Sequence, residues 1–396
     1  MFTLLRNADV HAPHHRGVVD LLLVAGRVVW FGTGGSPLGA GLPVEEVDLE
    51  GAVVVPGLVD GHVHVTGGGG EGGPTTSIPQ PALSTYTTAG VTTVVGLLGT
   101  DDVVRTPGQV HARVRALREL GLGAWMLTGG YGLPPATVTG DLVTDLVHVD
   151  AVVGVGEVAV SDHRGTAPTV DDLVALVTRV RTAALLGGKA GSVHLHLGDG
   201  TTGLDPVRDA VAASNAPPRH WHPTHVNRQG RLLEDAIDLV RTAGVRIDVT
   251  AFPVDAPDDP AVAAGPALTT ALDAGVPLDL LTCSSYAGGS LPVFDTTGEL
   301  LRLETAGCDG LLDAVRHLVD SGLPLSDALR PVTSTPADHL GLGGIGRLDV
   351  GSPDHLVVLD EDLAVRSVHA GGEWHVRDGV TRIDDPFSRP TPGSHA

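Results

Sequence analysis

Short apolar runs rich in valine, leucine and alanine recur along the middle of the chain and alternate with longer amphipathic stretches. The clearest amphipathic stretches, 106–120 and 169–186, repeat apolar residues every three to four positions, as a helix with one buried face does. Eight apolar runs of strand length can be counted, near 57–65, 92–99, 124–129, 152–159, 192–198, 221–226, 245–250 and 278–284. Eight strands alternating with helices predict an α/β fold, a (β/α)8 TIM-like barrel.

The two ends of the chain show a different pattern, in which short strands are separated by turn residues. Residues 1–56 and 340–383 both have this pattern, and neither segment is large enough to bury a sheet face alone. We therefore predict that the two ends form one small β-sandwich domain. The barrel domain is then 57–339. The last segment, 384–396, is polar and rich in proline, and we expect it to be a mobile tail.

Composition narrows the classes of partner. The chain has 396 residues, 42% of them hydrophobic, which is enough for a sizeable core. Its 25 basic and 47 acidic residues give a formal charge of −22, which argues against nucleic acid and anionic membranes as partners. No apolar run approaches the roughly 20 residues of a membrane-spanning helix.

The cysteines and the first residues of the chain indicate the cellular compartment. Cys283 and Cys308 are too few for a disulfide framework and suit a reducing compartment. The opening residues lack a basic region followed by an apolar run, as a signal peptide would have. We therefore expect a cytoplasmic protein.

Histidines mark the ends of three predicted barrel strands. The first strand ends in His62 and His64, which face the same side because side chains alternate along a strand. Taken alone, this pair could be two ordinary histidines beside a glycine-rich loop. The fifth strand adds His196 and the sixth ends at His225, and a barrel brings such strand ends to one rim. Four convergent imidazoles indicate a transition-metal site. His194 shares the face of His196 but lies deeper, so we expect it in the core or supporting a ligand.

Glu157 stands in the fourth strand among valine, alanine and glycine. A carboxylate there is costly to bury unless it is paired or bound to metal. We predict that it bridges two metal ions; the alternative is that it points outward and pairs with an arginine. The expected cofactor is a divalent metal, zinc first, at one or two sites.

The chain resembles the isoaspartyl (β-aspartyl) dipeptidases of the amidohydrolase superfamily, over roughly residues 2–380. The motifs that carry the resemblance are PGLVDGHVH at 56–64, GGGGEGGPTT at 67–76, SDHR at 161–164, PTHVNR at 223–228 and LRPVTS at 329–334. The resemblance implies a small amino-acid or dipeptide-like substrate and a homo-oligomer.

The resemblance also implies roles for individual residues. His62 and His64 would bind one metal, and His196 and His225 the second. Glu71 and Ser290 would hold the α-ammonium of the substrate.

Arg164 and Arg228 would take carboxylates, for which a bidentate donor is suited. Tyr131 would donate its hydroxyl to the developing oxyanion. Thr100 and the glycines around Gly69 would line the pocket. From the residues alone, each arginine could instead be a solvated charge, and Tyr131 a packed aromatic.

Two positions depart from the family pattern. Glu157 stands where the family has a carboxylated lysine, and Lys189, the only lysine, follows a helix and cannot take that place. Tyr286 stands where the family has a metal-binding aspartate that carries a proton during hydrolysis. A phenol, with an ordinary pKa of about 10, is a poor base for that task.

Three hypotheses follow. The protein could still cleave an isoaspartyl-like amide, with another proton carrier; Asp162, His163 and His222 are candidates, although we expect His222 at the surface. It could catalyse a non-hydrolytic reaction (a lyase, an isomerase or a cyclising amidase) on an aspartate-like substrate, with Tyr286 as proton donor. Less favoured is a catalytically silent homologue, which has no physical need for such a pocket.

Overall fold

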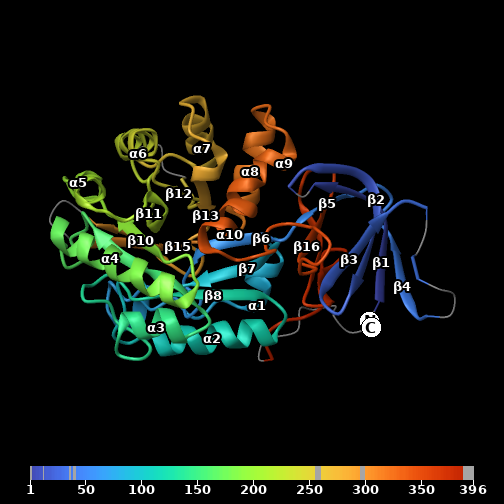
Figure 1. Ribbon diagram of the computed structural model, residues 1–396, viewed down its shortest axis with the longest axis horizontal. Coiled ribbons are helices and arrows are strands. Elements are labelled where there is room, and N and C mark those ends of the chain that lie inside the picture. Colours follow the sequence, from blue (N-terminus) through green and yellow to red (C-terminus); the bar gives the residue numbers. More distant parts are fainter. Residues whose placement is uncertain are drawn as a thin grey trace.

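A computed structural model describes residues 2–11, 13–34, 37–38, 42–254, 260–294 and 299–386. The chain forms a barrel of strands surrounded by helices, with a smaller sheet domain at one side (Figure 1). The sheet domain combines blue strands from the start of the chain with red strands from its end. The predicted fold class is confirmed.

The barrel wall consists of eight strands, one for each predicted run. They are β6 (Leu58–Val63), β7 (Val91–Gly96), β8 (Gly123–Thr128), β9 (Val152–Val160), β10 (Ser192–Leu197), β11 (Trp221–Thr224), β12 (Ile247–Thr250) and β13 (Leu281–Ser284). Strands β6 to β11 form one parallel sheet in chain order, and β12 pairs with β13. Strand β12 lies beside β11, and β13 lies beside β6, so the strands close into a barrel.

Side chains complete the contact between β13 and β6. Asp60 accepts hydrogen bonds from the backbone amide and the hydroxyl of Ser285. Burial raises the pKa of Asp60 to about 6, although these hydrogen bonds oppose the shift. The amide of His64 also donates to the carbonyl oxygen of Ala287, at 2.9 Å. Residues just after β13 are thereby held against the end of β6 that carries His62 and His64.

Helices lie between and after the barrel strands along the chain. They are α1 (Leu83–Thr87), α2 (Pro107–Glu119), α3 (Leu142–His148), α4 (Val170–Gly187), α5 (Asp205–Ala213), α6 (Gly230–Ala243), α7 (Ala264–Asp273), α8 (Gly310–Asp320), α9 (Leu325–Ala328) and α10 (Ser334–Leu340), with 3-10 turns η1 (Pro74–Thr76), η2 (Pro218–His220), η3 (Leu278–Leu280) and η4 (Arg330–Val332). The two stretches singled out in the sequence begin at capping boxes, on Thr106 and Thr169. Helix α4 ends where Gly188 adopts a left-handed conformation, with φ 64°. No helix of the described chain is both long and apolar enough to cross a membrane.

The sheet domain draws on both ends of the chain. Its strands are β1 (Phe2–His11), β2 (His15–Val24), β3 (Arg27–Gly32), β4 (Val44–Asp48), β5 (Val53–Pro56), β16 (Leu356–Leu359), β17 (Val365–Ala370), β18 (Glu373–Arg377) and β19 (Val380–Thr381). Strand β5 pairs with β16, which joins the two ends, and β1 pairs first with β4 and then with β5. The bounds predicted for the two domains stay a prediction. Residues 387–396 of the predicted tail lie outside the described residues.

One element was not predicted. The hairpin of β14 (Ser290–Phe294) and β15 (Leu300–Thr305) follows the last barrel strand. It carries Ser290 to the mouth of the barrel, where the candidate site lies.

Candidate metal centre and substrate pocket

The five residues predicted to bind metal lie together at the mouth of the barrel, and all are buried. They form two groups that share Glu157: one with His62 and His64, the other with His196 and His225. Within each group the candidate ligand atoms lie within 4.8 Å of one another. Glu157 therefore faces the inside of the barrel, on β9, and does not point outward to an arginine.

The first group has the arrangement of a metal site. Oε1 of Glu157 lies 3.5 Å from Nε2 of His62 and 3.5 Å from Nε2 of His64. These three atoms are buried, and none has a hydrogen-bond partner among the described residues. Ligand atoms about 2.0–2.2 Å from one zinc ion lie about 3.4 Å apart in a tetrahedron. Three unpartnered lone-pair atoms at that spacing fit a divalent cation.

The second group is held together by hydrogen bonds. Oε2 of Glu157 lies 2.8 Å from Nδ1 of His196 and 3.3 Å from Nε2 of His225. The other nitrogen of His196 faces Asp162, at 3.0 Å, and the other nitrogen of His225 faces the hydroxyl of Thr250, at 2.7 Å. A metal bound here would take the place of the hydrogens that lie between Glu157 and the two imidazoles. His196 would then have to release its contact with either Glu157 or Asp162.

The two oxygens of Glu157 thus serve different groups. Burial alone would raise the pKa of Glu157, but the neighbouring His62, His196 and His225 hold it well below its ordinary value. The carboxylate is ionised at neutral pH, as a bridging ligand must be. A glycine makes room for it, because a Cβ at Gly99 would lie 3.0 Å from Oε1 of Glu157.

Tyr286 lies directly against the metal-binding histidines. The centroid of its ring is 5.0 Å from that of His62, 4.9 Å from that of His64 and 5.0 Å from that of His225. Burial raises the pKa of its phenol further above the ordinary value. With its pKa raised, the phenol keeps its proton at neutral pH, so it can donate a hydrogen bond and is a poor base.

A recess beside His64 contains the predicted ammonium site. Glu71 accepts hydrogen bonds at Oε1 from the hydroxyls of Ser290, at 2.8 Å, and Thr100, at 3.3 Å. Its Oε2 is buried with no hydrogen-bond partner among the described residues. The backbone at Gly69 has φ 77°, and a Cβ there would lie 2.6 Å from the carbonyl oxygen of Thr76. The free oxygen of Glu71 is suited to a ligand cation.

The two arginines line a cavity of about 280 Å³ together with Tyr286 and Ser290. Arg164 already pairs with Asp162, through Nε at 2.9 Å and NH2 at 2.6 Å. Nε of Arg228 is buried and has no hydrogen-bond partner among the described residues. Arg228 is therefore the better placed of the two to take a ligand carboxylate.

Tyr131 and Asp162 both contact His196. The hydroxyl of Tyr131 lies 3.0 Å from Nδ1 of His196, and the ring of Tyr131 lies under the guanidinium of Arg164, at 5.5 Å. Burial opposes ionisation of Asp162, but hydrogen bonds from His196 and Arg164 hold its pKa far below the ordinary value. Asp162 thus orients its neighbours and is a weak base.

The other proton-carrier candidates lie elsewhere. His163 is exposed. The expected surface position of His222 is wrong: its side chain is buried on β11, where Nδ1 contacts Nδ1 of His194 at 2.9 Å. His194 in turn contacts Nδ1 of His62 at 2.8 Å, which agrees with the supporting position expected for it. Sequence reasoning missed Asp248, a buried carboxylate behind these histidines; its position next to Val249 in β12 was the available signal.

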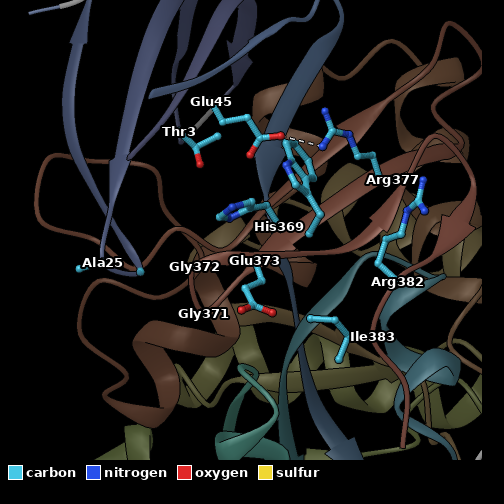
Figure 2. Close-up of a pocket in the computed structure, with 12 residues that line it drawn as sticks. Thr3, Ala25, Glu45, His369, Gly371, Gly372, Glu373, Arg377, Arg382 and Ile383 are labelled. Carbon is cyan, nitrogen blue, oxygen red and sulfur yellow. Dashed lines mark hydrogen bonds and ion pairs between the residues drawn. The ribbon is translucent and has the colours of Figure 1, made fainter. Parts of the chain in front are cut away.

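A larger cavity, of about 770 Å³, lies beside the sheet domain (Figure 2). There Arg377 pairs with Glu45, at 2.7 Å, and its guanidinium lies 5.6 Å from the ring centroid of Trp374. None of the metal-ligand groups formed by the described residues lines this cavity. The candidate site is therefore the barrel mouth.

Comparison with solved structures identifies the family of the chain. The chain superposes on the β-aspartyl dipeptidase of Fervidobacterium islandicum AW-1, solved in complex with β-Asp-Leu, with a TM-score of 0.89 and 34% identity, covering 98% of this chain and 100% of the other. The chain belongs to the β-aspartyl (isoaspartyl) dipeptidase family of the amidohydrolase superfamily. An enamidase of the same superfamily, at 17% identity and a TM-score of 0.65, shares the fold. The superposition covers 97% of this chain and 100% of the enamidase.

Curated sequences give more distant similarities. Adenine deaminase 1 of Jannaschia sp. (strain CCS1) is 24% identical over 409 residues, which cover 99% of this chain and 61% of that protein. The adenine deaminase of Ruegeria sp. (strain TM1040) is 23% identical over 97% of this chain and 59% of that protein. This member of the β-aspartyl dipeptidase family thus spans about 60% of the length of these curated relatives. No protein-family profile matches the chain.

Proposed function

We propose that the protein is a metal-dependent hydrolase that acts on the amide or isopeptide bond of an aspartate-like amino-acid substrate. One observation carries the proposal: unpartnered Nε2 atoms of His62 and His64 converge with Oε1 of Glu157 beside a pocket of opposite charges. That pocket offers a free carboxylate oxygen on Glu71 and a free N–H on Arg228, which match the ammonium and carboxylate of an amino acid. The β-Asp-Leu complex of the Fervidobacterium relative supports this substrate class.

Each of three pocket residues has a proposed role toward the substrate. Glu71, fixed by Ser290 and Thr100, binds the α-ammonium, and Arg228 takes a carboxylate. Tyr131, placed against His196, offers its hydroxyl to the oxygen on which charge develops.

Zinc is the expected metal, held by His62, His64 and Glu157, with a second ion at Glu157, His196 and His225. When bound, such a metal supplies Lewis acidity that activates water and polarises an amide carbonyl. Three protein ligands suffice for a catalytic zinc site, so the first group can act without an aspartate at 286. We place the reaction in the cytoplasm, where buried free thiols such as Cys283 and Cys308 are stable, and expect a homo-oligomer.

A second candidate function is a non-hydrolytic reaction on the same class of substrate. The protonated phenol of Tyr286 favours it, because a proton donor beside the metal ligands suits a lyase, an isomerase or a cyclising amidase. The retained ammonium and carboxylate sites speak against a catalytically silent protein.

The test combines metal analysis with an activity screen on protein purified without chelators. We expect bound transition metal, and binding of β-aspartyl dipeptides with slow release of free aspartate. Consumption of the dipeptide to a product other than its two amino acids would favour the second function. A stable protein that cannot be loaded with metal would refute both.

A further inference from the structure

A row of buried hydrogen bonds leads away from the metal centre on the other side of the His62 ring. Nδ1 of His62 lies 2.8 Å from Nε2 of His194, and Nδ1 of His194 lies 2.9 Å from Nδ1 of His222. Nε2 of His222 lies 2.9 Å from the hydroxyl of Thr282, which donates to Asp248 at 2.6 Å. All five side chains are buried. These residues are called the histidine relay below.

The direction of every hydrogen bond follows from the Asp248 end. The hydroxyls of Thr282, Thr224 and Ser284 all converge on the Asp248 carboxylate. Burial raises the pKa of Asp248, but these three hydroxyl donors oppose the shift and favour the ion, which can only accept. The single hydroxyl hydrogen of Thr282 points to Asp248, or to the carbonyl oxygen of Ile247 at 3.3 Å. In both cases the Thr282 oxygen accepts from His222, so the hydrogen of His222 is on Nε2.

The donor and acceptor nitrogens of the three histidines follow from this first hydrogen bond. Each contact between two of these imidazoles needs one hydrogen between its nitrogens, and a ring with one N–H and one lone pair provides it without the cost of a buried charge. Because His222 has its hydrogen on Nε2, its Nδ1 must accept from Nδ1 of His194. Nε2 of His194 then has the lone pair and accepts from Nδ1 of His62. His62 therefore has a hydrogen on Nδ1, which leaves Nε2, the nitrogen that faces Glu157, to bind a metal.

We propose that the histidine relay positions the metal centre: it fixes the tautomer and ring orientation of His62, so that Nε2 presents its lone pair to the metal. Metal-binding histidines commonly donate their second N–H to a carboxylate or carbonyl; here the carboxylate is reached through two further imidazoles and a hydroxyl. The inference rests on the metal centre proposed above. It assigns positioning roles to His194, His222, Thr282 and Asp248.

The surroundings of His222 support a role beyond packing. His339 packs against it with 4.0 Å between ring centroids and is itself fixed, because Arg246 donates to its Nδ1, at 2.7 Å, and Ser192 lies 2.7 Å from its Nε2. Apolar side chains would fill the bottom of a barrel without the cost of burying polar groups. A row of imidazoles whose hydrogen bonds all run in one direction instead fixes the ring orientation of His62.

The tautomers can be read directly from the full chain. Long-range ¹H–¹⁵N NMR correlation on histidine-labelled protein, with signals assigned from single-histidine variants, should show the Nδ1–H tautomer for His62 and His194 and the Nε2–H tautomer for His222. The pattern for His194 and His222 is expected in metal-free protein as well. A hydrogen on Nδ1 of His222 would overturn the proposal.

Zinc affinity, measured by competition with a chromophoric chelator, tests the consequence. His222→Leu should raise the zinc dissociation constant by about 10–100-fold. His222→Gln should restore most of the affinity, since the amide offers one acceptor and one donor. The matched control is His220→Leu, which removes a buried histidine whose Nδ1 contacts the carbonyl oxygen of Gly191 instead of the relay; its zinc affinity should equal that of the parent.

The outcomes separate the two proposals. An unchanged zinc dissociation constant in folded His222→Leu would overturn the relay and leave the proposed function standing. A parent protein that binds no zinc would defeat the proposed metal site, and the tautomers of the metal-free protein would still decide the relay. If His222→Leu does not fold, the tautomer spectrum of the parent decides.

Discussion

The ring of Tyr286 packs edge to face against the ring of His64, with 4.9 Å between centroids and 86° between ring planes. The same ring lines both the recess of Glu71 and the cavity of Arg228. Tyr286 therefore stands between the metal ligands and the place where a substrate would be held. From the family resemblance we expect an aspartate at the position of Tyr286, and that aspartate would both bind metal and carry a proton.

Replacing Glu157 tests the metal centre. Glu157→Gln keeps the size of the side chain but removes the negative charge that faces both histidine groups, so we expect most of the bound metal to be lost. Elemental analysis after dialysis measures this, with Glu119→Gln, on an exposed side chain, as the control. Full metal content in Glu157→Gln would contradict the bridging role.

Removing Arg228 tests substrate recognition. Its buried Nε has no hydrogen-bond partner among the described residues, so a ligand carboxylate would be its counterpart. Arg228→Ala should weaken binding of aspartate or β-Asp-Leu by about 2–5 kcal/mol in calorimetry. Arg231→Ala, on a side chain that is 84% exposed, should bind like the parent. Equal affinity in Arg228→Ala and the parent would remove Arg228 from the site.

Stability should depend on pH through two histidines of the sheet domain, His375, which is buried, and His355, which is half-buried. Burial lowers the pKa values of His355 and His375 from 6.5 to about 4. Between these values the unfolded chain binds protons that the folded chain does not, so the free energy of unfolding should fall as pH falls from about 6.5 to about 4. Each such histidine contributes a slope of about 1.4 kcal/mol per pH unit.

The variant His375→Phe should make that slope shallower in urea denaturation, because one proton fewer is taken up on unfolding. His14→Phe, at an exposed position, should leave the slope as it is. Parallel curves for the parent and His375→Phe would show that His375 is protonated in the folded state.

Much of the barrel could be predicted because its signals are local. Alternating side chains place His62 and His64 on one face, and strand ends in a parallel barrel meet at one rim. Glu157 was identifiable because a carboxylate amid apolar residues needs a partner. The predicted residues at the mouth do lie together, although their chemical roles stay predictions.

What the sequence could not supply is contact between distant strands. His222 looked like a surface residue because its segment gives no sign that Thr282 and His194 lie on either side of it. The pairing of Arg164 with Asp162 was missed for another reason, since it depends on the conformation of the turn after β9, which strand and helix periodicity does not specify. The β14–β15 hairpin follows the last barrel strand as an insertion, for which the alternation of strand and helix has no place.

The role of Tyr286 is tested most directly by comparing β-Asp-Leu hydrolysis by the metal-loaded parent and by Tyr286→Asp. A positioned general acid–base contributes about 10²–10⁴ in rate, so we expect slow or no hydrolysis by the parent and a clear gain in Tyr286→Asp. Hydrolysis by the parent at ordinary enzyme rates, about 1–10³ per second, would show that another group carries the proton. If both forms bind metal and β-Asp-Leu but neither cleaves it, the hydrolytic function is contradicted and the non-hydrolytic alternative gains.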